Sequence, residues 1–167
     1  FARVGEPKWA LADPNELVHE VIELSRSDLQ RSHTHLELDL ATDLPGILVG
    51  RVEIEQVLLN LLRNSLDAMM QNTTAERRIG VCTRQVEDAY VQFTVTDTGP
   101  GLSDEQMQHL FEAFYTTKQN GMGIGLSLCR TLASHHEGDL WPEPAPEGGL
   151  SMHLRLPVAQ PTEDVAA

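Results

Sequence analysis

The sequence predicts an α+β domain in which helices cover one face of a mixed sheet. Apolar residues recur at helical spacing in three long segments, and elsewhere they alternate with polar residues as in half-buried strands. These segments follow in the order helix, strand, helix, strand, strand, helix, strand, strand, and no internal repeat is visible. This order is typical of an α+β fold whose helices gather on one side of the sheet.

The first half of the chain predicts two helices with one strand between them. The first helix should begin at the pair Asp13-Pro14, a helix-start signal, and place Leu17, Val21, Leu24 and Leu29 on its apolar face. Residues 35–41 alternate leucine with polar residues, which predicts a half-buried strand. The clearest helical pattern covers residues 51–70, where one stripe contains Ile54, Val57, Leu58, Leu61, Ser65 and Met69.

The second half predicts two pairs of strands and two helices. A turn at Glu87 and Asp88 should join the first pair, and Ser103 could cap a short helix after it. A helix is expected at residues 124–136, and a loop rich in Pro and Gly separates the second pair of strands. The four strands are expected at residues 79–86, 90–97, 138–141 and 150–156.

The composition excludes several classes of protein. With 25 acidic and 12 basic side chains the formal net charge is −13, which argues against a domain that mainly binds nucleic acid or anionic lipid. Cys82 and Cys129 form no CxxC spacing, so a reducing compartment fits better than a disulfide framework or a zinc site. No apolar run reaches the ~18 residues of a membrane span, and no signal peptide is visible.

The helix at residues 51–70 carries an unusual polar face. Asn60, Asn64, Asp67 and Gln71 follow at i, i+4, i+7 and i+11, away from much of the apolar stripe. Asparagine is unfavourable in helix interiors, so two asparagines one turn apart call for an explanation. Amide oxygens are hard, neutral ligands that suit Mg²⁺ bound together with phosphate and water, but a solvated polar face explains the same pattern.

The segment DTGPGL follows the strand at residues 90–97. Asp97 closes that strand, and Gly99 and Gly101 would let a ligand approach the backbone closely. A carboxylate there can accept a hydrogen bond from an exocyclic amine such as that of adenine. An ordinary turn is the alternative, and the DTG of aspartic proteases is a further one that this helix pattern disfavours.

The segment GMGIGLS leads into the helix at residues 124–136. It is neither the GxGxxG of dinucleotide folds nor a Walker loop, since the chain contains no Gly-Lys pair. The helix N-terminus would favour an anion, and Lys118, one of only two lysines, lies just upstream. We expect a flap that closes over phosphates, and a glycine hinge without a ligand is the alternative.

Together NLLRN, DTGPG, FEAFYTTK and GMGIGLS resemble, in order and spacing, the nucleotide-binding catalytic domain of bacterial sensor histidine kinases. These belong to the Bergerat (GHKL) superfamily, with gyrase, MutL and the heat-shock chaperone ATPases. The resemblance spans about residues 13–157 and is strongest to the nitrogen-regulation and oxygen-sensing branch. It implies a two-layer α/β sandwich with a mostly antiparallel sheet of about five strands, about three helices on one face, a flexible ATP lid, and ATP (or ADP) with Mg²⁺ as ligands.

The resemblance also implies roles for the matching positions. As metal and catalytic positions, Asn64 would hold Mg²⁺, Asn60 would lie beside the metal and phosphates, and Lys118 would approach the polyphosphate. Asp97 would receive the adenine amino group. The other nucleotide-binding positions would be Gly99, Gly101, Leu102, Thr117, Gly121, Gly123, Gly125, Leu126 and Ser127.

The resemblance implies minor roles for other matching positions. Phe111 and Phe114 would anchor the flap, and Arg63 could add positive charge near the phosphates or face solvent. The small hydroxyl residue that the family often carries near the adenine falls on His153 here, with Ser151 two residues earlier.

Asn60 bears on the type of reaction. Hydrolases of the superfamily carry a Glu four residues before the metal-binding Asn, to activate water, whereas an amide cannot act as a base at neutral pH. Transfer to another acceptor is therefore expected, and the resemblance implies a histidine in an H-E-x-x-Asn/Thr-Pro motif on a dimerisation helix pair. His19-Glu20 is the nearest match but lacks the polar residue and the Pro, so the acceptor is expected N-terminal to this chain.

We therefore expect the catalytic domain of a two-component sensor kinase that phosphorylates a histidine of its own homodimer, for relay to a response regulator. A gyrase- or chaperone-type ATPase clamp and a non-catalytic docking module stay open. Residues 1–12 would be a linker, 13–157 the catalytic domain and 158–167 a disordered tail. The chain alone is expected to be monomeric, without a nucleic-acid partner, and cytoplasmic, with an inner-membrane anchor left open for the full-length protein.

Overall fold

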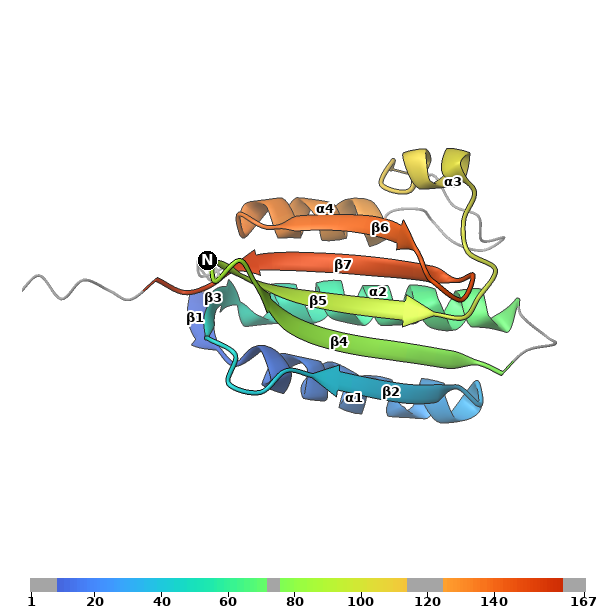
Figure 1. Ribbon diagram of the computed structural model, residues 1–167, viewed down its shortest axis with the longest axis horizontal. Coiled ribbons are helices and arrows are strands. Elements are labelled where there is room, and N and C mark those ends of the chain that lie inside the picture. Colours follow the sequence, from blue (N-terminus) through green and yellow to red (C-terminus); the bar gives the residue numbers. More distant parts are fainter. Residues whose placement is uncertain (1–8, 72–75, 114–124, 161–167) are drawn as a thin grey trace, which may run out of the picture.

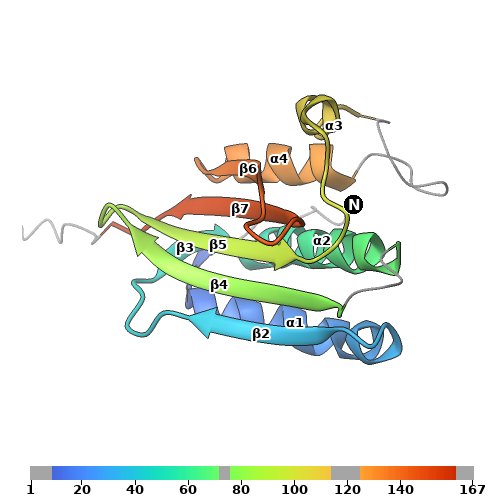
Figure 2. The ribbon, with the colours of Figure 1, turned by 45° about the vertical axis from the view of Figure 1, so that its right-hand side comes forward.

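The computed structural model describes residues 9–71, 76–113 and 125–160, and it has two layers (Figure 1). One layer is a five-stranded sheet in the order β2-β4-β5-β7-β6, in which β2 is parallel to β4 and all other neighbours are antiparallel. In the other layer α1, α2 and α4 lie side by side on one face of the sheet (Figure 2). The α+β sandwich expected from the sequence is confirmed.

The bounds of the elements agree closely with the expected segments. The sheet consists of β2 (His35–Leu40), β4 (Arg78–Val86), β5 (Tyr90–Asp97), β6 (Asp139–Pro144) and β7 (Leu150–Pro157). The helices are α1 (Pro14–Arg31), α2 (Arg51–Met70), α3 (Asp104–His109) and α4 (Gly125–His135).

Both predicted helix caps are present. Asp13 Oδ1 accepts a hydrogen bond from the backbone N–H of Asn15 at 2.9 Å, with Pro14 in the first helical position of α1. Ser103 and Gln106 form a capping box at the start of α3, in which each side chain binds the backbone of the other residue. These local bonds explain why both helices begin where the sequence indicated.

The buried stripe of α2 is the predicted one, but that of α1 is not entirely so. All six residues expected to face the core from α2 are buried. In α1, Leu24 is 66% exposed and Ser25 is buried in its place. The stripe follows the helical period from Val18 and Val21 to Ser25 and Leu29, and Leu24 lies about 100° away from it. The assignment of Leu24 to the apolar face was wrong.

A two-stranded ribbon was missed altogether. β1 (Trp9–Ala12) pairs antiparallel with β3 (Ile47–Gly50) next to the helical layer. The assignment of residues 9–12 to a linker was therefore wrong, because strands this short become visible only through their pairing. At the other terminus, Val158 and Ala159 donate backbone hydrogen bonds to Ala89 and Gly46, so these two residues belong with the folded part and not with a disordered tail.

The core lies between the sheet and the helices and fixes the parts of the site relative to one another. Phe93 in β5 and its cross-strand partner Leu154 in β7 are fully buried, as are Ile54 and Leu61 of α2. Burying each such side chain stabilises the fold by about 1.5–3 kcal/mol. The positions of β5, β7 and α2 are thus held by apolar packing.

Among the described helices, none combines the length and the apolar character that a membrane span requires.

Candidate functional site: a buried carboxylate at the end of β5

Asp97 is the last residue of β5 and is only 3% exposed. Its Oδ1 accepts hydrogen bonds from the backbone N–H of Gly99 at 3.0 Å and of Leu150 at 3.2 Å. Gly99 belongs to the turn after β5 and Leu150 begins β7, so two strands hold the carboxylate. Because Oδ1 already accepts two bonds, Oδ2 is the atom suited to receive an N–H group of a ligand.

A third group, the side chain of Ser65 in the middle of α2, acts on Asp97 from the helical layer. Burial raises the pKa of Asp97, and the hydrogen bonds from Gly99, Leu150 and Ser65 oppose that rise. A carboxylate that stays ionised in such surroundings is a strong acceptor for an amine N–H.

The glycines around Asp97 are required by close backbone packing. A Cβ on Gly149, in the turn between β6 and β7, would lie 1.9 Å from the carbonyl oxygen of Asp97. Gly101 has a φ of +71°, and a Cβ there would lie 2.8 Å from the carbonyl oxygen of Gly148. A Cβ on Gly99 would lie 3.2 Å from the Cβ of Ala68 in α2. The turn after β5 is therefore packed between α2 and the turn that leads into β7.

Asn60 connects α2 to the first turn of α4. Its Nδ2 donates to the carbonyl oxygen of Gly125 at 3.2 Å and lies 3.4 Å from Sγ of Cys129. A Cβ on Gly125 would stand 3.1 Å from the same Nδ2, so the two helices are in direct contact here. Burial raises the pKa of Cys129, against the hydrogen bond from Asn60, which keeps this thiol protonated near neutral pH.

Asn64 lies one turn after Asn60 and directly precedes Ser65, so it occupies the stretch of α2 between the start of α4 and the turn after Asp97. Leu126 and Ser127 continue the first turn of α4: Leu126 packs against the core, and Ser127 accepts a hydrogen bond from the Thr131 side chain at its carbonyl oxygen, 3.1 Å away. Leu102, just after Gly101, is half-buried.

Not all of the expected positions fall within the described residues. Thr117, Lys118, Gly121 and Gly123 lie outside them, as does Phe114. Phe111 is described, packs against the core and has the Arg130 guanidinium 4.7 Å from its ring centroid. Phe111 therefore links the segment after α3 to α4.

His153 lies away from Asp97, which corrects the expectation that it stands beside the base. It pairs with Thr94 in β5, and its Nδ1 is 2.8 Å from Thr94 Oγ1. Side chains alternate along a strand, so Thr94 and Asp97 point to opposite faces of the sheet. The hydroxyl of Ser151, which is 2.8 Å from that of Thr96, is on the same outer face as His153.

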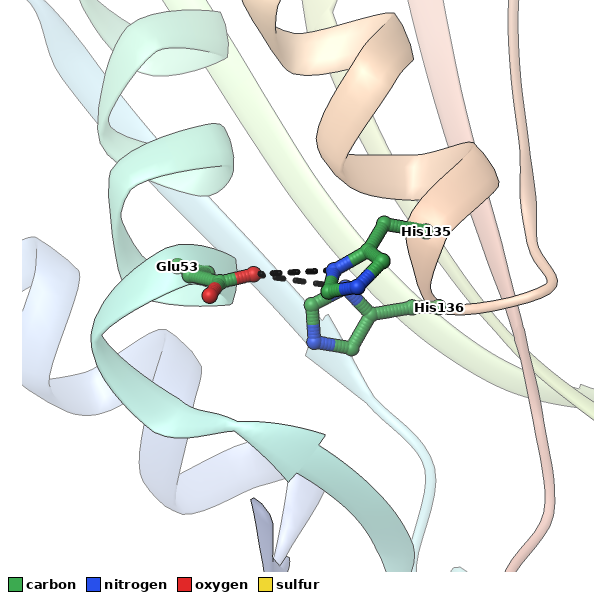
Figure 3. Close-up of side chains that lie close together, drawn as sticks. All are labelled: Glu53, His135 and His136. Atoms are coloured by element: carbon green, nitrogen blue, oxygen red, sulfur yellow. Dashed lines mark ion pairs between the residues drawn. The ribbon is translucent and has the colours of Figure 1, made fainter. Parts of the chain in front are cut away.

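A second group of ionisable side chains lies at the far end of α4 (Figure 3). Glu53 Oε2 is 3.6 Å from Nδ1 of His135 and 3.8 Å from Nδ1 of His136. His136 Nε2 accepts from the backbone N–H of Gly50 at 3.0 Å, and its Nδ1 lies 2.8 Å from the carbonyl oxygen of Leu132, to which it donates. A metal ion would have to replace one of these bonds; as the structure has it, the group ties α4 to the start of α2.

Three of the residues that shape the Asp97 site were not recognised as such from the sequence. Ser65 was assigned to the apolar stripe of α2, and Gly149 and Leu150 were read as part of a loop and a strand start. Two signals could have pointed to them: a hydroxyl within an otherwise apolar helix stripe, and a Gly-Gly pair directly before the last strand.

Comparison with known proteins agrees with this geometry. Residues 50–160 match the family described as histidine kinase-, DNA gyrase B- and HSP90-like ATPases. The chain is 34% identical over 159 residues to the sensor protein FixL of Bradyrhizobium diazoefficiens and 35% identical over 161 residues to the sensor histidine kinase TmoS of Ectopseudomonas mendocina. Each alignment covers 95% of this chain but only 31% of FixL and 16% of TmoS.

The fold is that of a solved kinase domain. The catalytic domain of histidine kinase ThkA superposes with a TM-score of 0.79 at 25% sequence identity, covering 91% of this chain and 99% of that domain. The chain therefore belongs to the family of histidine kinase-, DNA gyrase B- and HSP90-like ATPases, as a catalytic domain of the sensor histidine kinase type.

Proposed function

We propose that this domain binds ATP between α2, the turn after β5 and the start of α4, and donates its γ-phosphoryl group to a histidine on a separate dimerisation domain. The observation that carries the proposal is Asp97, a buried carboxylate with one oxygen saturated by two backbone amides. Such a group is suited to accept the 6-amino group of adenine, because its position and acceptor atom are already fixed. Full-length ShkA, which shares this fold, has been solved in complex with AMPPNP.

The phosphates would lie toward α4. This helix has 11 residues, and the N–H groups of its first turn, at Gly125, Leu126 and Ser127, favour an anion. Thr117 and Lys118 would reach the polyphosphate from the flap, with Gly121 and Gly123 allowing the flap to fold over it. Asn60 would hold the start of α4 against α2 beside the phosphates.

The polar face of α2 fits a magnesium ion that is held mainly by its substrate. Asn64, with Asn60 one turn before it, offers neutral amide oxygens, and Mg²⁺ keeps phosphate and water ligands in such surroundings. When bound, Mg²⁺ would neutralise charge on the phosphates. The contribution of this chain itself is to hold the amide oxygens on α2, at a fixed distance from Asp97 at the end of β5.

In the transfer, a ring nitrogen of the acceptor histidine attacks the γ-phosphorus. A P–N bond forms, and the P–O bond to the β-phosphate breaks with its electron pair leaving on ADP. The position four residues before Asn64 carries an amide, Asn60, which cannot take a proton from water, so transfer is favoured over an ATPase clamp. Onward transfer to a response regulator is in keeping with ThkA, solved in complex with the response regulator TrrA.

We extend the proposal to the organisation of the chain. Residues 9–159 would form the catalytic unit, with the residues before them leading from the dimerisation helices of a homodimer. On this proposal the dimer contacts belong to those helices, and the chain alone is monomeric.

Isothermal titration with ADP and Mg²⁺ tests the proposal. The wild-type chain should bind, and Asp97→Ala should weaken binding roughly 10- to 100-fold, since a hydrogen bond to a charged group is lost. Asp39→Ala is the matched control, because Asp39 is 72% exposed and pairs with Arg84 on the surface. A folded chain that does not bind ADP, or an Asp97→Ala variant that binds as well as the wild type, would defeat the proposal.

A further inference from the structure

A pocket lies at the end of the sheet opposite Asp97, and the proposed function does not use it. It has a volume of about 850 Å³, within the range of roughly 300–1,000 Å³ that ligand pockets have. The ribbon of β1 and β3, the turn between β4 and β5, and the end of β7 meet there, at the left of Figure 1. Its walls are largely apolar and consist in that part of Trp9, Leu48, Val49, Ala89, Leu156, Pro157 and Val158.

The ribbon extends this apolar surface beyond the pocket. Leu11 and Leu48 are cross-strand partners, so they share one face of the ribbon, and Trp9, two residues before Leu11, lies on the same face. Leu11 is 69% exposed, Leu48 51% and Trp9 37%. Large apolar side chains that are exposed next to one another, beside a pocket, are typical of a surface that another segment covers.

The charges that line the pocket select the kind of occupant. The two carboxylates of Asp88 and Glu137 line it, and no lysine or arginine does among the described residues. His136 lines it too, but both of its ring nitrogens already take part in hydrogen bonds. Arg155, which lies over the ring of Tyr90 from outside the lining, is paired with a carboxylate of its own. An occupant that combines apolar and basic side chains therefore fits best.

We propose that residues 1–8 of this chain, FARVGEPK, dock in the pocket and over the exposed face of the ribbon. They lead directly into Trp9, which is part of the pocket lining, so the chain itself holds them there at a high local concentration. Eight extended residues reach about 26–29 Å, which is enough to cross the pocket and the ribbon.

The composition of this segment matches the walls. Phe1 and Val4 supply apolar side chains, whose burial against the ribbon is favourable. Arg3 and Lys8 supply positive charge against one negative charge, that of Glu6. The segment therefore brings both kinds of side chain that the pocket favours.

The other end of the chain is the rival occupant, and charge disfavours it. Residues 161–167 follow Gln160, which also lines the pocket. They contain Glu163 and Asp164 and no basic side chain, so the two carboxylates of the lining would repel them.

The docking has a consequence for the kinase that rests on the proposed function. There, the residues before Trp9 lead from the dimerisation helices. A docked segment holds this connection against the end of the sheet where β5 begins, whereas Asp97 lies at the end where β5 stops. It thus restricts how the catalytic domain can turn toward the acceptor histidine while leaving the nucleotide site uncovered.

Nitrogen-15 NMR relaxation of the whole chain, without nucleotide, is the test. The backbone order parameters of Arg3 and Val4 should be near 0.85, as in a rigid backbone, and fall below about 0.6 when docking is lost. The double variant Arg3→Glu, Lys8→Glu should cause that loss, and raised salt should weaken docking in the wild type.

Neutralising the pocket gives the reciprocal variant. Asp88→Asn with Glu137→Gln removes both carboxylates at exposed positions and should lower the order parameters of Arg3 and Val4. Glu37→Gln with Asp39→Asn is the matched control, because it removes the same charge from β2, where these side chains are 59% and 72% exposed. The control should leave the order of the segment unchanged.

Each other outcome overturns the inference. Order parameters below about 0.6 at Arg3 and Val4 in the wild type would show that the segment does not dock. Order that appears only at high protein concentration would assign the pocket to a second copy of the chain, and order at Glu163 and Asp164 instead would assign it to the other terminus. An ordered Arg3 in a chain that does not bind ADP would refute the proposed function and leave the docking intact.

Discussion

At the scale of single residues, Asp97 has opposing effects on stability and on recognition. Its burial disfavours the ionised form, and three hydrogen bonds only oppose this effect. Because the folded-state pKa lies above the ordinary value, Asp97 contributes stability below its unfolded-state pKa, and this contribution is lost as the pH rises through the folded-state pKa. Ionisation of Asp97 thus costs folding stability, while it supplies the acceptor that binding can use.

Asp97→Asn should separate the two effects. The amide oxygen can still accept from Gly99 and Leu150, so the free energy of unfolding at neutral pH should equal or exceed that of the wild type. ADP affinity should fall at least about tenfold, because an amide N–H would face the adenine amino group. Denaturant unfolding at several pH values gives a further check: the stability gain should grow as the pH rises, and a gain that grows toward acidic pH would contradict this account.

Gly149→Ala should disturb the site from the opposite side. Its new Cβ would lie 1.9 Å from the Asp97 carbonyl oxygen, so the turn before β7 must move and take the Leu150 N–H with it. We expect a loss of about 1–3 kcal/mol of stability, as for an overpacked interior, together with weaker ADP binding. Gly80→Ala is the control, since nothing lies within 4 Å of a Cβ placed there; equal effects of the two substitutions on ADP binding would argue against the role of Gly149.

At the scale of elements, α2 is the helix that holds the parts of the site together. Asn60 contacts α4, and Ala68 lies against the turn at Gly99 that follows β5. At its N-terminal end, the Gly50 N–H binds His136 at the end of α4. Both ends of α4 are thus tied to α2 or to the residue before it.

His136→Ala should loosen this tie. The substitution leaves the Gly50 N–H without its acceptor and opens a cavity where the His136 ring stacks on Trp9 at 4.6 Å. A loss of about 2–4 kcal/mol is expected in the free energy of unfolding. The neighbouring His135→Ala should change it by no more than about 0.5 kcal/mol, since that side chain is 56% exposed. Thermal or denaturant unfolding of the pair measures the difference, and equal losses would refute the tie.

Comparison of the helices and strands with the expected segments shows which of them the sequence could predict. Long elements with a clear period, such as α2, and local signals such as the caps at Asp13 and Ser103 were predicted correctly. The ribbon of β1 and β3 was missed, because four-residue strands carry little periodicity and their stability depends on pairing between distant segments.

The residues of the site also divide into those with a local sequence signal and those that depend on contacts between distant segments. Asp97 could be predicted from a strand end followed by glycines, which is local information. Its contact with Leu150, 53 positions away, depends on the register of β5 with β7, and the same register moved His153 to the outer face.

At the scale of the whole molecule, the two ends of the sheet are distinct. Asp97 lies at one end of β5, and Tyr90 lies at the other. Around Tyr90 is a pocket of about 850 Å³, lined also by Trp9, His136 and Leu156. A nucleotide could bind at either end of the sheet, and we propose that it binds at the Asp97 end.

A backbone-amide NMR titration of the chain with ADP and Mg²⁺ tests this assignment most directly. We expect the largest chemical-shift changes at Asn64, Gly99, Gly101, Gly125 and Leu150, with little change around Tyr90 and His136. Changes concentrated around Tyr90, or none anywhere at saturating ADP, would contradict it.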